Sequence, residues 1–460
     1  MQNQDMITDT LARHASSLAY SDIPAATLET AKRLLLDGIG CLLAGTRATP
    51  GRLAARTIAR FKFGGAGHST ILINGSRGSA RDAAFVNGIT LYGVGINDIH
   101  QPSGSHPGGC IIPVLLAVGE WQGSSGKDMI AAMTAGYDVQ GRLGRGVIPS
   151  HRERGFHPTG TLGTFGATAA AGRLLNLSSD LMVSAMGLAG SQAAGLKAYQ
   201  TDGSMTLIYH AGRAAQNGVE AAVLAQDGFV GPRTVIEDPM GFVAATSDRN
   251  DLQSITRGLG EQFEVDATSF RPYFGCALTI PGSGATARIM KTEPRHRPED
   301  VVAIKVRCSP LMVEEVSKAD PTTLLAARLS LQFNIGLVMM HGDVLIGDID
   351  EDDLNNPAIR RFLPLVEFET DPGIARYHCT VTVRFQDGGE ISAEASKLKG
   401  GPDNPMGWDD VEHKFLELVK PLGFGEQAAC IVQMVRGVEE TNGVDLVNAI
   451  NVLVRHSEVQ

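Results

Sequence analysis

The chain has 460 residues, of which 43% are hydrophobic and 20% are charged. This length exceeds one ordinary hydrophobic core and predicts two or three domains, and the composition excludes long disordered stretches. Lys and Arg total 40 against 50 Asp and Glu, which gives a formal charge of -10. That balance argues against a nucleic-acid partner, and an anionic substrate would need a local basic pocket.

The start of the chain and its cysteines bear on cellular location. The first twenty residues contain acidic side chains, no basic start and no apolar run, so no signal peptide is expected. Residues 34–43, the longest apolar stretch, are interrupted by Asp37 and are too few to span a bilayer. The six cysteines lie far apart without a CxxC pair, which disfavours thiolate metal sites and favours a reduced, cytoplasmic protein.

The first 265 residues predict helices. Residues 21–45 carry apolar side chains at roughly helical spacing, with Ser21 and Asp22 as potential caps and Gly45 at the end. Further apolar segments rich in Ala and Gly follow at residues 79–94, 111–121, 126–144 and 161–175. Small residues at this density allow helices to approach closely, so we expect a tightly packed helical core.

The pattern changes after Phe270. Residues 301–308 and 377–385 alternate like strands, the second before the turn Asp387-Gly388-Gly389, and residues 321–342 between them predict a helix. Helical patterning returns over residues 409–454. We therefore predict a mainly α fold with an inserted α+β domain: a helical domain formed by residues 1–268 and 396–460, and an α+β domain at 269–395.

The densest polar cluster is the loop at residues 97–109, between two apolar helices. It contains Asp98, His100, Ser103 and His106, and such groups can supply acid–base chemistry near neutral pH. The alternative is a capped, hydrogen-bonded connection whose histidines have no catalytic part.

A second loop, at residues 151–161, repeats the His-Pro pairing at His157-Pro158. The proline restricts the backbone after the histidine, and the following helix could face an anion with its N-terminus. Asp98, His100, His106 and His157 are also possible metal ligands, but their spacing matches no standard zinc or iron pattern.

Several cations are candidates for binding an anionic substrate. Arg142 and Arg145 share a helix face, where structural salt bridges are the more common role. Lys197 and Arg213 are further candidates. Arg271 lies where the helical and α+β parts join, and domain junctions favour pockets, so it is the strongest of these anchors.

Long segments of the chain resemble the MmgE/PrpD family, which includes 2-methylcitrate dehydratase, cis-aconitate decarboxylase and iminodisuccinate epimerase. The resembling segments are residues 34–46, 83–120, 136–145, 155–177, 201–225, 328–336 and 403–415. The resemblance implies a helical domain made from both chain ends, an α+β lid, and an active site where the two domains meet. It also implies a homodimer that needs no cofactor and acts on small di- or tricarboxylates.

Position by position, the resemblance is partial. Asp98, His106 and His157 stand where the family has an acid and two active-site histidines, whereas Ile96 replaces a further acid and His100 a Thr or Ser.

Positively charged and aromatic positions differ as well. Leu207 stands where the family has a lysine thought to face the substrate, Arg271 replaces another lysine, and Phe333 replaces a tyrosine. Losing the ammonium at Leu207 removes a partner for a carboxylate, which is costly to bury alone. Either the substrate carries fewer carboxylates than citrate-like molecules, or Lys197 and Arg271 supply the missing charge.

We therefore predict a lyase of the 2-methylcitrate dehydratase type that removes a proton alpha to a carboxylate. His106 or His157 is the expected base, the other or His100 the acid, and Asp98 orients a histidine. Arg271 would hold a carboxylate and the enolate charge, with Lys197, Ser103 and Tyr209 as further substrate-binding residues. An epimerase, isomerase or decarboxylase of the same fold, and a non-catalytic carboxylate-binding protein, stay open as alternatives.

Overall fold

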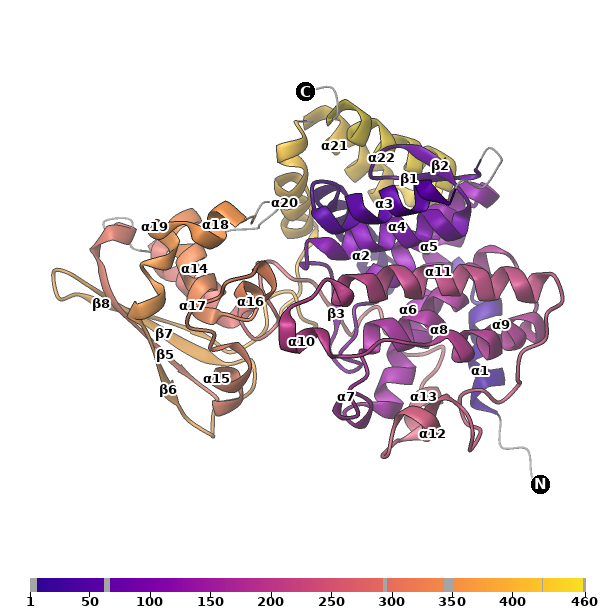
Figure 1. Cartoon of the computed structure of the whole chain (residues 1–460), viewed down its shortest axis with the longest axis horizontal. Helices are drawn as coiled ribbons and strands as arrows, with labels where there is room; N and C mark the ends of the chain where they lie inside the picture. Colours follow the sequence, from indigo (N-terminus) through magenta and orange to yellow (C-terminus); the bar gives the residue numbers. More distant parts are fainter. Residues whose placement is uncertain are drawn as a thin grey trace. The chain divides into compact units, whose positions relative to one another are not determined.

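A computed structural model describes residues 6–61, 67–292, 296–342, 349, 351–423 and 425–457. The chain divides into two compact units. Unit 1 consists of Met1–Ser269 and Val411–Gln460, and unit 2 consists of Phe270–Asp410 (Figure 1). The molecule is mainly α-helical, with small sheets and a small α+β region.

Unit 1 is built almost entirely of helices. From the first part of the chain come α1 (Ile7–Ser17), η1 (Tyr20–Asp22), α2 (Ala25–Gly45), α3 (Thr49–Arg60), α4 (Ala80–Gly93), α5 (Pro107–Gln122), α6 (Gly126–Val147), α7 (Ser150–Glu153), α8 (Pro158–Leu174), α9 (Ser179–Gln192), α10 (Tyr199–Asp202), α11 (Thr206–Gln226), α12 (Phe242–Thr246) and α13 (Leu252–Thr256). Two short antiparallel pairs accompany them, β1 (Ser69–Ile71) with β2 (Ser76–Gly78) and β3 (Ile99–His100) with β4 (Thr268–Ser269).

The end of the chain adds more helices to the same unit. These are α20 (Trp408–Val419), which begins at the unit boundary, η4 (Lys420–Leu422), α21 (Gly425–Arg436), η5 (Val438–Glu440) and α22 (Gly443–Ser457). Helix α21 packs on α2, and α22 packs on α5, so the yellow C-terminal helices lie beside the indigo and purple ones (Figure 1). Both ends of the chain therefore contribute to one helical core.

Small residues bring the central helices of unit 1 together, as the sequence predicts. A Cβ added to Gly88 of α4 would lie 2.9 Å from Gly212 Cα of α11, and one added to Gly136 of α6 would lie 2.8 Å from the Gly166 carbonyl oxygen of α8. Because side chains are absent at these contacts, the helix backbones approach closely and pack tightly.

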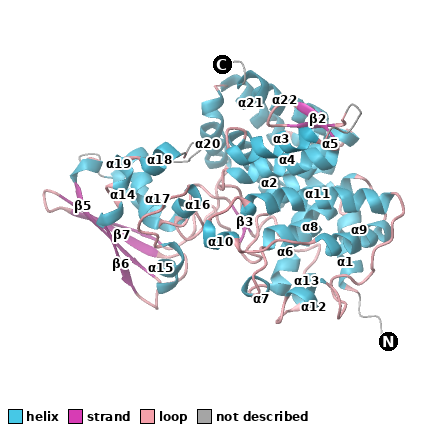
Figure 2. Ribbon diagram, in the orientation of Figure 1, coloured by secondary structure: helices cyan, strands magenta, loops and turns pink. Residues whose placement is uncertain are grey.

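Unit 2 is a four-stranded sheet with helices. The strands are β5 (Val301–Cys308), β6 (Val366–Thr370), β7 (Cys379–Phe385) and β8 (Glu390–Ala395), in the order β6-β5-β7-β8. Only β5 and β6 are parallel among these neighbours. The helices are α14 (Ile280–Thr292), η2 (Pro298–Asp300), α15 (Pro310–Val316), α16 (Leu324–Arg328), α17 (Leu331–His341), α18 (Glu351–Asn355), α19 (Pro357–Arg360) and η3 (Leu363–Leu365) (Figure 2). Residues of α14 and α17 bury one face of the sheet in a shared hydrophobic cluster.

Several predicted elements differ in their limits. The helix expected from residue 21 begins at Ala25, because Pro24 precedes it with an extended ψ of 145°. The helix expected over residues 321–342 is two helices, and the hydroxyl of Ser330 caps the second by accepting from Phe333 N–H (3.1 Å). The strand at residues 301–308 is confirmed as β5.

Candidate active site

The loop between α4 and α5 is a hydrogen-bonded turn. Ile99 and His100 pair with Ser269 and Thr268 in the β3–β4 ladder. The His100 N–H donates to the Ser105 carbonyl at 2.9 Å. Gly104 takes a positive φ of 58° inside this turn, which a side chain would disfavour.

Asp98 is buried beneath the loop, and its carboxylate accepts three hydrogen bonds. Gly108 N–H and the Tyr137 hydroxyl each donate to Oδ2 at 2.9 Å, and the Asn97 amide donates to Oδ1 at 3.2 Å. Burial raises the pKa of Asp98 to about 6, although these hydrogen bonds lower it. The carboxylate therefore ties the loop to the first turn of α5 and, through Tyr137, to α6.

His106 is the last residue before α5, and its tautomer follows from its contacts. Its Nδ1 lies 2.6 Å from the backbone carbonyl oxygen of Asp98. A carbonyl can only accept, so Nδ1 carries the proton and the lone pair of the neutral ring is on Nε2. The half-buried ring also packs edge-on against Tyr92, with centroids 5.3 Å apart. The ring of His106 is thus held by the Asp98 carbonyl and by Tyr92.

His157 is the last residue before α8 and is buried in a group of rings. Its Nδ1 lies 3.0 Å from Nδ1 of His210, and the Tyr199 ring packs edge-on against it at 5.2 Å. Burial lowers the pKa of His157 well below its usual value, and positive charge at His210, His106, Arg152 and Lys197 lowers it further. Burial likewise lowers the pKa of His210 to about 4. Both rings are therefore neutral near pH 7.

The structure brings His106 and His157 to the same end of the helical core. Each precedes a helix that begins with proline, and the two helices, α5 and α8, pack on each other. The His106 N–H donates to the hydroxyl of Thr159, in the first turn of α8, at 3.2 Å. The charge of His106 also affects the pKa of His157. Two histidines from two separate loops therefore lie at this end of the helical core.

His100 and Ser103 lie in a buried network. The His100 ring has Nε2 2.7 Å from Glu264 Oε2 and Nδ1 2.8 Å from Ser103 Oγ, and both residues are fully buried. Arg145 donates to Glu264 at 2.8 Å, as expected for a structural salt bridge. Burial raises the pKa of Glu264, but the hydrogen bonds from His100 and Arg145 prevail and lower it to about 2. Both nitrogens of His100 are thus occupied within the protein.

Lys197 lies beside the His157 loop. The segments at residues 155–157 and 195–197 run alongside each other: Lys197 N–H donates to the Gly155 carbonyl (2.8 Å), and His157 N–H donates to the Gly195 carbonyl (2.9 Å). The ammonium of Lys197 lies 3.5 Å from the Arg152 carbonyl oxygen. A half-buried positive charge therefore flanks His157.

Tyr209 and Arg271 lie in different surroundings. Tyr209 is on α11, 46% exposed, with its ring edge-on to Phe85 at 6.1 Å. Arg271 belongs to unit 2, where it is buried and donates to the Gly275 carbonyl at 3.3 Å.

The three positions that depart from the family pattern are also placed. Ile96 is buried at the start of the loop, and its carbonyl accepts from Lys414 Nζ at 2.8 Å. Leu207 is half-buried on α11. Phe333 is buried in α17 of unit 2.

The sequence did not single out His210, Glu264 or Arg152 as members of this site. His210 and Glu264 lie 53 and 164 residues from their histidine partners, so no local spacing connects them. Arg152 had a usable signal, because it lies in the same short loop as His157.

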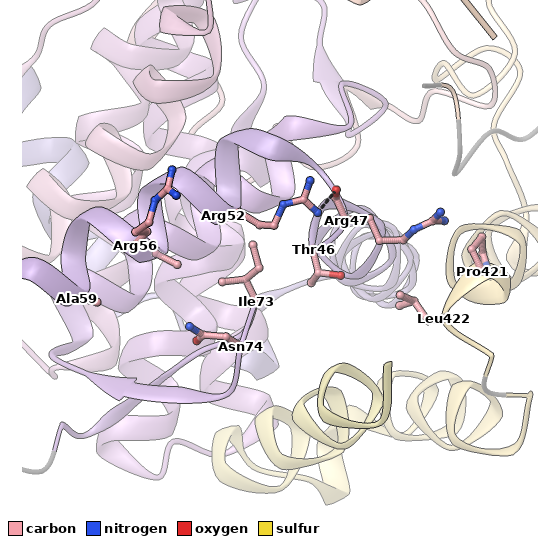
Figure 3. Close-up of a pocket in the computed structure, with 10 residues that line it drawn as sticks. Thr46, Arg47, Arg52, Arg56, Ala59, Ile73, Asn74, Pro421 and Leu422 are labelled. Carbon is pink, nitrogen blue, oxygen red and sulfur yellow. Dashed lines mark hydrogen bonds between the residues drawn. The ribbon is translucent and has the colours of Figure 1, made fainter. Parts of the chain in front are cut away.

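Other features of the described residues lie outside this site. No group of three or more His, Cys, Asp or Glu within the described ranges could hold a metal ion. No described helix has the length and apolar character needed to cross a bilayer. A cavity of about 460 Å³ between α2, α3 and η4 is lined by Arg47, Arg52 and Arg56 (Figure 3) and contains none of the predicted site residues.

These features place His106 and His157 directly before two helices that pack on each other. The family model of the MmgE/PrpD N-terminal domain matches residues 9–255, and that of the MmgE/PrpD C-terminal domain matches residues 276–440. The chain belongs to the MmgE/PrpD family.

Its relatives include enzymes of known reaction. The human cis-aconitate decarboxylase is 26% identical over 94% of this chain and 92% of its own length. The cis-aconitate decarboxylase-like protein of Aspergillus oryzae is 27% identical over 95% of both chains, and the cis-aconitate decarboxylase of Aspergillus terreus is 25% identical over 90% of this chain and 89% of its own. Decarboxylases are lyases, so these relatives support an enzyme of the lyase class.

Proposed function

We propose that this protein is a cofactor-independent lyase that moves a proton at the carbon beside a carboxylate of a small organic acid. The observation that carries the proposal is the fixed ring of His106. The Asp98 carbonyl accepts from its Nδ1–H, so the lone pair of the neutral ring is on Nε2, and the nearby ring of His157 is neutral as well.

His106 Nε2 is the proposed base. In an elimination it takes the alpha proton, the C–H electrons form the new double bond, and the bond to the leaving oxygen breaks. That oxygen takes up a proton and departs as water. Such a base contributes about 10²–10⁴-fold to the rate.

His157 is the proposed hydrogen-bond donor. If His210 Nδ1–H donates to His157 Nδ1 across the 3.0 Å contact, the His157 proton resides on Nε2. A neutral imidazole in this state can stabilise a developing enolate or leaving oxygen, as neutral histidines in other enzymes do.

Loss of carbon dioxide is the second candidate, and the names of the relatives favour it. In a decarboxylation, the electrons of the breaking C–C bond remain on the alpha carbon, and protonated His106 donates a proton to that carbon. The same two histidines serve both reactions, and an epimerase would use them without any elimination.

The remaining predicted residues take supporting parts in the proposal. His100 and Ser103, enclosed with Glu264, fit positioning of the loop better than proton transfer. Lys197 is proposed to bind a substrate carboxylate. Arg271 and Tyr209 are proposed as substrate-binding residues on the resemblance alone, as is a homodimer.

The reaction can be identified with a panel of small mono-, di- and tricarboxylates. A thermal-shift screen selects ligands, and each hit is then followed in deuterated water by proton NMR, ultraviolet absorbance and carbon dioxide release. Elimination produces a conjugated acid, decarboxylation releases gas, and epimerisation exchanges deuterium without net loss. If the hits undergo none of these reactions, the proposed function is wrong, and a non-catalytic carboxylate-binding protein is the remaining alternative.

A further inference from the structure

The charged side chains of the segment at residues 152–154 differ in their partners. Arg154 pairs with Asp248 at 2.9 Å, and Glu153 pairs with Arg249. No described carboxylate pairs with the guanidinium of Arg152, which is half-buried. A partly desolvated cation without an internal anion, in a chain with a formal charge of -10, is suited to an anion from solution.

The guanidinium of Arg152 lies beside Gly104, in the loop at residues 97–109 that contains His106. A Cβ added to Gly104 would lie 3.4 Å from Arg152 Cδ and 3.5 Å from its Nη1. Gly104 is two residues from His106, and its positive φ and missing side chain leave room for the arginine. Arg152 therefore connects the two loops that supply the two histidines.

Arg152 also borders the rings around His157. Its positive charge affects the ionisation of both His157 and Tyr199, and Tyr199 packs edge-on against His157. Lys197 lies on the same side, with its ammonium beside the Arg152 backbone. Two cations are thus gathered at one edge of the histidine pair.

We propose that Arg152, with Lys197 beside it, binds a second carboxylate of the di- or tricarboxylate that the family resemblance implies. The inference rests on the proposed function, because one carboxylate must stand beside the reacting carbon. The second then lies on Arg152, whose planar fork can hold both oxygens.

The test is calorimetric binding of unreactive acids at fixed ionic strength. The probes are tricarballylate, glutarate and butyrate, with three, two and one carboxylates. Arg152→Gln should weaken binding of the first two at least tenfold and change that of butyrate less, while Arg152→Lys should recover part of the loss. The matched control Arg154→Gln removes the same charge two residues away and should stay within twofold of wild type.

Three results would contradict the proposal that Arg152 binds a carboxylate. They are unchanged binding in Arg152→Gln, equal weakening in Arg154→Gln, and no binding of any probe to the wild type. Melting curves verify that both variants fold. Arg152→Gln should match the wild type because Arg152 has no described carboxylate partner to lose, and Arg154→Gln should stay close to it because the Arg154–Asp248 pair is exposed and contributes little to stability. Binding does not require turnover. A wild type that binds tricarballylate through Arg152 but converts no acid of the panel would therefore refute the proposed lyase and leave the anchor in place.

Discussion

At the scale of single residues, the two ring nitrogens of His106 have different roles, one in holding the loop and one in the proposed chemistry. Nδ1–H holds the Asp98 carbonyl, whereas Nε2 is the proposed base. The side-chain N–H of an asparagine can donate in place of Nδ1–H, but asparagine has no basic nitrogen in place of Nε2.

His106→Asn should therefore lower turnover about 10²–10⁴-fold while leaving the melting temperature close to wild type. His106→Ala should lose turnover equally and also lose about 0.5–1.5 kcal/mol of stability with the hydrogen bond. Steady-state kinetics and thermal unfolding check the two effects. An asparagine variant with wild-type turnover would remove His106 from the mechanism.

Burial of His210 against His157 predicts that the free energy of unfolding depends on pH. The pKa of His210 falls from 6.5 to about 4 on folding, so between these values the unfolded chain binds more protons. The free energy of unfolding must then decrease as pH falls from 6.5 towards 4, by at most about 1.4 kcal/mol per pH unit for this group. Asp98, with a pKa raised to about 6, acts in the opposite direction.

Comparison of the wild type with His210→Gln isolates this contribution, because Asp98 is present in both. The variant should lose less stability than the wild type between pH 6.5 and 4.5 in urea titrations. Parallel losses would mean that His210 is not held neutral by the fold.

Residue types in the sequence singled out several residues of the candidate site but not the pairs that they form. Asp98, His106 and His157 stand out in the sequence because polar groups with proline and glycine interrupt apolar helices. The contacts of His157 with His210 and of His100 with Glu264 form only through the tertiary fold, so their roles could not be read from spacing.

At the scale of elements, a buried ion pair holds the start of the loop at residues 97–109. Lys414 of α20 lies 2.5 Å from Asp37 of α2 and 2.8 Å from the Ile96 carbonyl oxygen, and both charged side chains are 1% exposed. The C-terminal helix α20 thereby fixes the loop that the N-terminal part of the chain provides.

Lys414→Met should leave Asp37 as a buried charge and cost about 3–5 kcal/mol of stability. Adding Asp37→Leu should restore much of this loss, because no buried charge then remains. Chemical denaturation of the two single variants and the double variant measures the coupling. Independent, additive losses would contradict the pairing.

The close approach of α6 to the loop gives a second test at this scale. A Cβ at Gly144 would collide with Ser103 Cβ, whereas one at Gly119 would meet the flexible Met129 at 3.4 Å. Gly144→Ala should cost about 1–3 kcal/mol and lower turnover by displacing the loop. Gly119→Ala, a matched substitution in α5, should retain both stability and turnover. An active Gly144→Ala variant would show that the loop tolerates displacement.

Elements with a strong periodic pattern were predicted well. The strands β5 and β7 follow from alternation, because one face of each is buried. The helices rich in Ala and Gly follow from long apolar segments, and α6 is buried on nearly all sides. Strand β6 was not predicted: it is five residues long at the sheet edge, and three of them are Glu or Thr. Its parallel pairing with β5 arises only from the tertiary fold.

At the scale of the whole molecule, the proposal places a small basic region within an acidic chain. The formal charge of -10 repels anions at long range, while Arg152 and Lys197 attract them locally. The homodimer implied by the family resemblance is also a property of this scale. Light scattering should give twice the mass of one chain, and a single-chain mass would contradict it.

The central claim is that His106 transfers a proton at a carbon beside a carboxylate while His157 donates a hydrogen bond to the developing charge. Proton NMR in deuterated water tests it most directly, on wild type, His106→Asn and His157→Gln with the same carboxylic acid taken from the ligand screen. The account predicts that the wild type exchanges or converts the alpha C–H, and that both variants still bind the acid but lose this chemistry. Exchange or conversion at near wild-type rates in both variants would contradict it.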